Sequence, residues 1–229
     1  MSKFITIAID GPGAAGKSSV AKEIARRLNY TYIDTGAMYR CLALYALNNN
    51  ISVDDEEALC EAVDHLDIQL SNTGKVILNG EDVSLAIRSS AVTNNVSPVS
   101  SPRSVREKFV KLQQKLAKQQ NGVVMDGRDI GTVVLPDADL KIFQIASPEV
   151  RAKRRYDENL TKGIHTPLKD LEEEIKRRDY LDENKSFGAL KKAHDAIELD
   201  TSYMSFEEVV EHILNLAKDL IKWEKRLLP

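Results

Sequence analysis

Apolar runs of strand length alternate with amphipathic helical patterns along most of the chain. The first apolar run, residues 4–10, is short and continuous, which is typical of a buried parallel strand. Behind it, Val20, Ile24 and Leu28 recur every four residues and predict the apolar stripe of a helix. This alternation predicts an α/β fold, with a parallel sheet and helices on both of its faces.

The alternation continues towards the end of the chain. Further apolar runs predict strands at residues 30–33, 122–125, 140–145 and 196–199. Periodic apolar positions predict further helices that begin near residues 37, 54, 105, 148, 167 and 206. Ligands of such folds bind at the carboxyl ends of the strands, so the loops that follow the strands should carry the chemistry.

Residues 66–100 have a different character. Two short β-like runs, 67–71 and 75–78, are joined by an Asn-Thr-Gly turn, and an Asn-Gly turn follows. These features predict a small antiparallel insertion, after which the Ser/Pro-rich stretch 97–102 returns the chain to the main domain. The predicted division is a core at 1–65 and 101–221, the insertion at 66–100, and a C-terminal tail at 222–229 that either extends the last helix or frays.

Composition sets the broad limits. A chain of 229 residues with 42% hydrophobic content suits one α/β domain with an insertion, or two small lobes. The formal net charge of −3 argues against a nucleic-acid partner. Cys41 and Cys60 lie in helical patterns without metal-type spacing, so we expect reduced packing residues. With no membrane-length apolar run and no room for a signal peptide, we expect a cytoplasmic monomer.

The stretch between the first strand and the first helix has the pattern Gly-x-x-x-x-Gly-Lys-Ser. Its glycines let the backbone wrap a phosphate, and Lys17 would reach the β- and γ-phosphates of ATP while the Ser18 hydroxyl ligates Mg²⁺. A glycine-rich turn without ligand is the alternative, but a strand before it and a helix after it favour a nucleotide site. The predicted ATP-binding residues are Gly11, Pro12, Gly13, Ala14, Ala15, Gly16, Lys17, Ser18 and Ser19.

Polar residues at the ends of two other strands are candidates for the phosphate acceptor site. Arg40 follows the strand at 30–33 and Arg128 follows the strand at 122–125, and an arginine there can grip a phosphate with two hydrogen bonds. Arg40 could instead be a solvated helix residue. Asp126 ends a buried strand opposite the Gly-rich loop, where an aspartate is the usual outer partner of Mg²⁺; it could also cap its own turn.

Two basic helices flank a loop that contains Gly163. Arg178, Asp182 and Lys185 are spaced to share one helix face. The preceding helix carries Arg151, Arg154 and Arg155, which we expect to face one way. Either set alone could be solvated surface charge, but together they predict an arginine lid, at residues 156–168, that closes over the transferring phosphates and excludes water.

Four segments carry a family resemblance. They are residues 10–18, 34–40 and 126–134 and the motif Arg178-Asp-x-x-Asp182. With them the chain resembles the bacterial cytidylate kinases, a family of P-loop nucleoside monophosphate kinases, over essentially all of residues 3–220. The resemblance implies a parallel-sheet P-loop kinase core, a helical lid, and an antiparallel insertion that serves as the monophosphate-binding domain.

The resemblance also implies a reaction, the in-line transfer of the γ-phosphoryl group of ATP to CMP or dCMP with Mg²⁺. The implied substrate contacts are Thr35, Arg40 and Arg128 on the CMP phosphate, Ser97, Arg106 and Asp129 on the cytosine, and Arg178, Asp182 and Lys185 on the ribose and nearby phosphates. The implied catalytic residues are Lys17, Asp126, Arg128, Arg154 and Arg178. Two positions depart from the family pattern: Lys185 stands where arginine is expected, which would weaken the ribose contact, and Thr35 stands where serine is common.

Two other functions are compatible with a P-loop. A kinase of another small-molecule acceptor would need a base-like residue near that acceptor. A non-enzymatic nucleotide-binding regulator of the GTPase type would carry an Asn-Lys-x-Asp motif, and Asn184-Lys185-Ser-Phe fails at its last position.

Overall fold

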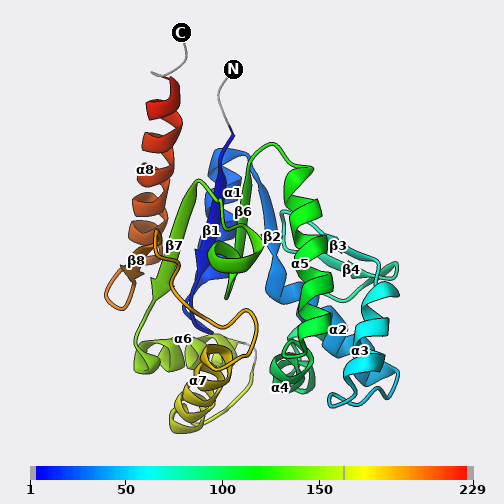
Figure 1. The fold of residues 1–229 in the computed structure, drawn as a ribbon. Helices are drawn as coiled ribbons and strands as arrows, with labels where there is room; N and C mark the ends of the chain where they lie inside the picture. The colour runs from blue at the N-terminus through cyan, green and yellow to red at the C-terminus, as the bar shows by residue number, and fades with distance from the viewer. Residues whose placement is uncertain (1–3, 162, 226–229) are drawn as a thin grey trace.

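A parallel β-sheet forms the centre of the computed structural model, which describes residues 4–161 and 163–225. Its strand order is β2-β6-β1-β7-β8, and every neighbouring pair is parallel. The strands are β1 (Thr6–Asp10), β2 (Thr31–Asp34), β6 (Val123–Gly127), β7 (Leu140–Ile145) and β8 (Ile197–Asp200). Their carboxyl ends all point towards α6 and α7 (Figure 1). The predicted parallel sheet is thereby confirmed.

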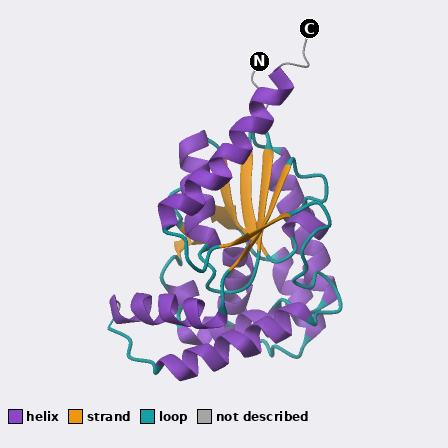
Figure 2. Ribbon diagram, turned by 90° about the vertical axis from the view of Figure 1, so that its left-hand side faces the viewer, coloured by secondary structure: helices purple, strands orange, loops and turns teal. Residues whose placement is uncertain are grey.

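Helices cover both faces of this sheet (Figure 2). Side chains of α1 and α8 pack on one face, against Ile7 and Ile9 of β1. On the other face, α5 packs against Ile33 and Met125. The helix bounds are α1 (Lys17–Leu28), α2 (Thr35–Asn48), α3 (Glu56–Asp64), α4 (Ser90–Val99), α5 (Arg103–Lys118), α6 (Pro148–Thr161), α7 (Leu168–Glu183) and α8 (Phe206–Lys225). Because both faces are covered, β1 is a continuous apolar run rather than an alternating one.

A second apolar core joins α2, α3, α4 and the first half of α5. Phe109 of α5 is fully buried there, with its ring edge-on to Tyr39 of α2 at 4.7 Å between centroids. A small antiparallel sheet packs on the other side of α2, against Ala37 and Cys41. Its strands are β3 (Ile68–Leu70), β4 (Val76–Leu78) and β5 (Glu81–Asp82). Helix α2 is therefore buried on two sides, and it holds the insertion against the core.

The segment 66–100 differs from its prediction in one respect. The antiparallel strands end at Asp82, and the chain then forms a 3₁₀ turn (Ala86–Arg88) and helix α4. Pro98, expected in a connecting loop, lies in the last turn of α4. The Ser89 hydroxyl accepts a hydrogen bond from the Val92 N–H at 3.3 Å and caps this helix, which is the local signal that the prediction missed.

Other element boundaries moved by a few residues. Helix α2 begins at Thr35 rather than Ala37, because the Asp34 carboxylate accepts the Ala37 N–H at 2.8 Å and caps it. Of the predicted tail, residues 222–225 continue α8 and residues 226–229 lie outside the described residues. No helix in the described ranges is both long and apolar enough to cross a membrane.

Candidate active site

One cleft of about 590 Å³ lies at the carboxyl edge of the sheet. The loops after β1, β2 and β6 contribute to it, together with α4, α6 and α7, as expected for a parallel sheet whose loops carry the chemistry. Most of the predicted site residues line it: Gly13, Ala14, Ala15, Gly16, Lys17, Ser18, Ser19, Thr35, Arg40, Ser97, Arg106, Asp126, Arg128, Asp129, Arg154, Arg178, Asp182 and Lys185.

Gly11 and Pro12 do not line the cleft. A Cβ on Gly11, whose φ is +149°, would collide with the backbone carbonyl oxygen of Gln144 on β7. The Pro12 carbonyl oxygen accepts a hydrogen bond from Lys17 Nζ at 2.7 Å. In this structure, therefore, the start of the loop packs against β7 and orients the lysine.

Lys17 begins α1 at the floor of the cleft and is only 5% exposed. Burial, with the nearby Arg128 adding to it, lowers the pKa of Lys17 to about 7. The Gly16 φ of +89° turns the loop into the helix at this point. An ammonium held in so little water interacts strongly with an anion in the cleft.

Ser18 and Asp126 meet across the mouth of the loop. Ser18 Oγ donates to Asp126 Oδ2 at 2.7 Å, and the Tyr32 hydroxyl donates to Asp126 Oδ1 at 2.9 Å. Burial, with Asp34 adding to it, raises the pKa of Asp126 to about 6. Two protein oxygens of this kind fit Mg²⁺, which keeps most of its waters or takes phosphate oxygens. The described residues contain no cluster of three or more His, Cys, Asp or Glu side chains that would make a closed metal cage.

Arg40, Arg128 and Arg178 converge on the cleft beside Lys17. Arg128 Nε donates to Asp182 at 2.8 Å, whereas Arg40 donates to the Ile87 carbonyl and the Thr93 hydroxyl. Burial and the neighbouring arginines lower the pKa of Arg40 to about 9 and that of Arg178 to about 10. Both guanidinium groups stay charged at neutral pH, and neither forms an ion pair with a carboxylate among the described residues.

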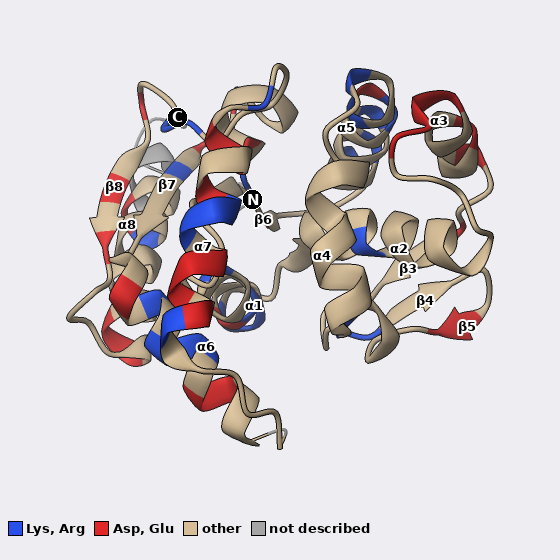
Figure 3. Ribbon diagram, turned by 90° about the horizontal axis from the view of Figure 1, so that it is seen from below, with Lys and Arg blue, Asp and Glu red and all other residues tan. Residues whose placement is uncertain are grey.

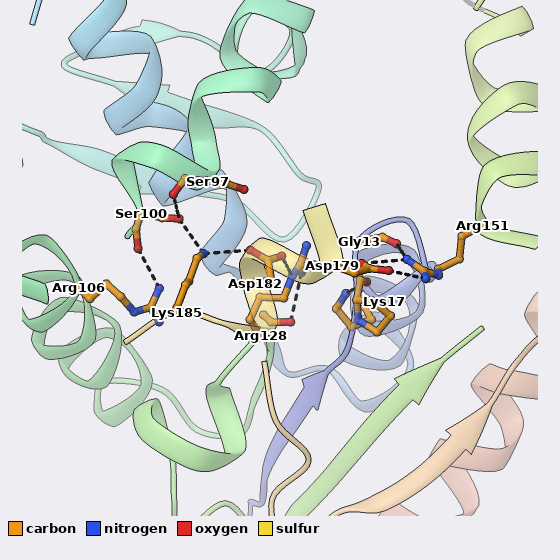
Figure 4. Close-up of polar contacts among 12 residues, drawn as sticks. Gly13, Lys17, Ser97, Ser100, Arg106, Arg128, Arg151, Asp179, Asp182 and Lys185 are labelled. Carbon is orange, nitrogen blue, oxygen red and sulfur yellow. Dashed lines mark hydrogen bonds and ion pairs between the residues drawn. The ribbon is translucent and has the colours of Figure 1, made fainter. Parts of the chain in front are cut away.

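Asp182 collects cations from two elements (Figure 4). Its Oδ2 accepts from Arg128, and its Oδ1 lies 3.0 Å from Lys185 Nζ, which also donates to Ser100 Oγ at 3.0 Å. Although burial acts to raise the pKa of Asp182, these cations hold it well below its usual range. Lys185 was expected on the same helix face as Arg178, and this was wrong because α7 ends at Glu183. The lysine reaches the cleft from the loop after the helix.

Arg106 and Asp129 form a buried ion pair that lines the same cleft as Lys17. The Arg106 guanidinium lies over the ring of Tyr39 at 5.4 Å and is 3% exposed. Ser97 of α4 also lines the cleft. Charged groups of both signs and a hydroxyl therefore gather where a polar ring could lie.

The three arginines of α6 all reach the Gly-rich loop or the cleft, but Arg151 is buried in an ion pair with α7. Arg151 is 3% exposed and is held by Asp179 at 2.6 Å and by the Gly13 carbonyl at 3.0 Å, so it ties α6 and α7 to the Gly-rich loop. Arg154 donates to the Thr201 carbonyl at 2.7 Å, and Arg155 lines the cleft. In Figure 3 the ribbons of α6 and α7 are coloured at many charged residues, whereas α4 carries no charged residue.

Thr35 lines the cleft, but its hydroxyl hydrogen is already used. The hydroxyl donates to the backbone carbonyl of Asp126 at 2.7 Å. With this hydrogen bond in place, Thr35 can accept a hydrogen bond from a ligand. To donate one, its hydroxyl would have to turn away from the Asp126 carbonyl.

Three residues at this site were missed from the sequence. Asp10, at the end of β1, accepts the N–H groups of Ile130 and Gly131 at 2.8 and 2.7 Å. Gln144 of β7 donates to the Ala15 carbonyl at 2.7 Å and so braces the Gly-rich loop. Arg88 lines the cleft and pairs with Asp34 at 3.2 Å. A polar residue in an otherwise apolar strand was the available signal for the first two.

The chain is similar to known cytidylate kinases over nearly its whole length. The cytidylate kinase family model matches residues 7–219. A cytidylate kinase of Bacillus cereus is 55% identical over 220 residues, covering 95% of this chain and 97% of that one. One from Bacillus thuringiensis is 54% identical with the same coverage. A solved gluconokinase from Sinorhizobium meliloti shares the fold, with a TM-score of 0.52 at 14% identity over 98% of this chain and 97% of that one.

The burial of Asp10 predicts a pH dependence of stability. Burial outweighs its two backbone hydrogen bonds and raises the pKa of Asp10 from 3.8 to about 6. Between these values the folded protein holds a proton that the unfolded chain has lost, so this contribution to stability is lost as the pH rises from about 4 to about 6. We expect the unfolding free energy of the wild type, relative to Asp10→Asn, to fall across that window in urea titrations and to level off above it.

Asp137→Asn is the matched control, because Asp137 is exposed. Its difference from the wild type should not follow the same window. A wild-type advantage over Asp10→Asn that is constant from pH 4 to pH 8 would contradict the assignment.

Proposed function

The chain belongs to the cytidylate kinase family, and from this premise we propose how its cleft phosphorylates CMP with ATP. ATP lies with its phosphates on the loop at residues 13–19, and CMP or dCMP lies between Arg40 and the Arg106–Asp129 pair. The γ-phosphoryl group then passes in line to the CMP phosphate. The observation that carries this proposal is that one cleft is lined by Lys17, by the Arg106–Asp129 pair and by the arginines Arg40, Arg128 and Arg178.

Charge stabilisation supplies the catalysis in this proposal. The acceptor is already a phosphate anion, so no general base is needed. Arg40 and Arg178, which have no carboxylate partner within the described ranges, would bind the phosphate groups where charge accumulates in the transition state. Arg128 and Arg88, each held by an aspartate, would complete this shell. The N–H groups at the N-terminus of α2, and the Thr35 hydroxyl once turned away from the Asp126 carbonyl, would donate to the CMP phosphate.

We assign the Mg²⁺ ion that accompanies ATP, the phosphate donor, to Ser18 and Asp126. Their oxygens lie 2.7 Å apart beside the phosphate-binding loop, and this donor set suits Mg²⁺. The ion held by these residues would neutralise charge on the phosphates of ATP. Ser18 would bind it directly, and Asp126 would orient its bound water.

Cytosine would be read by Asp129, Arg106 and Ser97. Cytosine offers an amino donor at N4 next to acceptors at N3 and O2, and this pattern requires one acceptor and two donors in the protein. Asp129 supplies the acceptor; Arg106 and Ser97 supply donors. Uracil presents an acceptor at O4, which the carboxylate would repel, so the same pocket disfavours UMP. Asp182 and Lys185 would hold the ribose.

We also propose that residues 156–168 act as a lid. Arg155 reaches the cleft from α6 without a carboxylate partner in the described part of the chain, and Arg178 reaches it from α7. Arg151 and Asp179 would form the fixed base of the two helices, because they are tied to the loop at Gly13. Arg154 would contact the donor nucleotide from beside Thr201.

The two alternative functions gain less support. Asp129 and Asp182 are each paired with a cation, which leaves neither of them free to act as the base that a hydroxyl acceptor would need. The likeness to the gluconokinase concerns the fold alone. Action as a monomer is part of the same proposal, because one chain supplies both the Gly-rich loop and the acceptor pocket. We also propose that the protein acts in the cytoplasm.

Lys17→Ala should keep the fold but lose phosphoryl transfer. The Lys17 ammonium donates to the Pro12 carbonyl of its own loop, and its charge acts on the phosphates in a site with little water. We expect kcat to fall about 100-fold or more in a coupled assay of ADP formation. The control is Lys111→Ala, on the exposed face of α5, which should keep wild-type turnover. Near-normal turnover of Lys17→Ala would refute the assignment of the donor site.

Lid closure should be visible in hydrogen exchange. With a non-hydrolysable ATP analogue and CMP bound together, amides of residues 156–161 and 163–168 should exchange more slowly than in the free protein. Amides of β1, already buried in the sheet, serve as the internal control. Equal exchange of the lid in both states would show that it does not close.

Asp129→Asn should narrow base selectivity. The amide can donate to the O4 of uracil, so the ratio of kcat/KM for CMP to that for UMP should fall about 10- to 100-fold. Asp137→Asn is the control, since that aspartate is exposed and outside the cleft. An unchanged ratio would mean that Asp129 does not read the base.

A further inference from the structure

Residues 184–190 form an irregular loop between α7 and the last strand, against the Arg106–Asp129 pair. Three contacts fix the loop. Lys185 bridges Asp182 and Ser100, the Leu190 N–H donates to the Asp182 carbonyl at 2.8 Å, and the Phe187 ring lies 5.3 Å from the Arg103 guanidinium. The backbone between these anchors therefore has a defined position.

Gly188 sits at the point where this loop meets the ion pair. A Cβ added to Gly188 would collide with Arg106 Nη2 and with Asp129 Oδ2, and it would lie 2.5 Å from Arg106 Nε. Arg106 Nη2 and Asp129 Oδ2 are the interacting atoms of the pair itself. The space that a side chain would fill at residue 188 is thus occupied by the guanidinium and carboxylate groups.

The guanidinium also lies near Tyr39, whose ring centroid is 5.4 Å away, and its Nη1 donates to the Ser100 carbonyl at 3.4 Å. Arg106 is 3% exposed, and its Nε has no hydrogen-bond partner among the residues that the structure describes. Packing rather than a complete set of hydrogen bonds therefore sets the position of this arginine. A change in the packing at residue 188 has to move the pair.

We propose that Gly188 is a specificity-determining residue of this chain. By lacking a side chain it lets Arg106 and Asp129 lie deep against the loop, so that the free edge of the pair faces the acceptor base at the right depth. Gly188 touches no substrate, and it acts through the pair. The proposal rests on the proposed reading of cytosine by Arg106 and Asp129.

Gly188→Ala is the direct test, and Gly80→Ala is its matched control. Both glycines have a positive φ, +64° and +87°, so alanine is strained at each, but an added Cβ at Gly80 meets nothing within 4 Å. We expect Gly188→Ala to raise KM for CMP and to lower the CMP/UMP ratio of kcat/KM about 10-fold, with KM for ATP unchanged within about two-fold. Gly80→Ala should leave the ratio at its wild-type value.

The outcomes separate this proposal from the one on which it rests. If Asp129→Asn lowers the CMP/UMP ratio and Gly188→Ala does not, the reading of the base stands and the role of Gly188 is refuted. If neither variant changes the ratio, both assignments are refuted. Equal losses for CMP and ATP in Gly188→Ala would point to general disruption of the cleft and would also overturn the proposal.

A second variant decides the case in which Gly188→Ala lowers the stability of the fold. Arg106→Lys keeps a charge for Asp129 but removes the guanidinium atoms that an alanine at 188 would meet. The loss of thermal midpoint caused by Gly188→Ala should therefore be smaller in the Arg106→Lys background than in the wild type. An equal loss in the two backgrounds would place the cost in the loop backbone and would overturn the proposal.

Discussion

Positive charge in excess of its buried counter-ions is the constraint on which the site depends. Asp182 pairs with Arg128 and Lys185, and Asp129 pairs with Arg106, but Arg40 and Arg178 reach the same cleft without a carboxylate of their own in the described part of the chain. Burying unpaired charge is costly, and the lowered pKa values of both arginines express that cost. Phosphate groups offset this cost, so the same charges that are costly to bury favour the binding of a nucleotide.

The fold holds these charges in place through backbone contacts. Asp10 at the end of β1 accepts two N–H groups of the turn after β6, so the strand that begins the Gly-rich loop also positions the segment that carries Arg128 and Asp129. Gln144 of β7 braces the same loop from the other side. Arg151 reaches the Gly13 carbonyl and, through Asp179, joins α6 and α7 to that loop. The Gly-rich loop, the turn after β6 and these two helices are thereby joined at one edge of the sheet, which supports the precise positioning that the proposed in-line transfer requires.

The sequence predicted the parallel sheet and most of the residues that line the cleft for identifiable reasons. The apolar runs of β1 and β7 are continuous because both faces of the sheet are covered, and the residues that line the cleft follow these strands directly. Helix α4 was missed because its Ser, Asn and Pro residues weaken the apolar period. The burial of Arg151 was not predicted, because spacing gives the face of a helix but not the partner, here Asp179, that covers it. Lys185 was placed on α7 because the helix end at Glu183 has no glycine or proline to mark it. Gly188 carries no local pattern, and its importance depends on Arg106 and Asp129, which are distant in the sequence.

The central claim is that unpaired positive charge in the cleft binds the substrate phosphate. Its most direct test compares the affinities of CMP and cytidine, which differ only in that phosphate, by isothermal titration of the wild type and of Arg40→Met. The account predicts that CMP binds the wild type about 100-fold or more tightly than cytidine, since hydrogen bonds to charged groups contribute about 1.5–3 kcal/mol each. It also predicts that Arg40→Met removes much of this gap while leaving the affinity for cytidine unchanged. Equal affinities of the wild type for CMP and cytidine, or a gap that Arg40→Met leaves intact, would contradict the account.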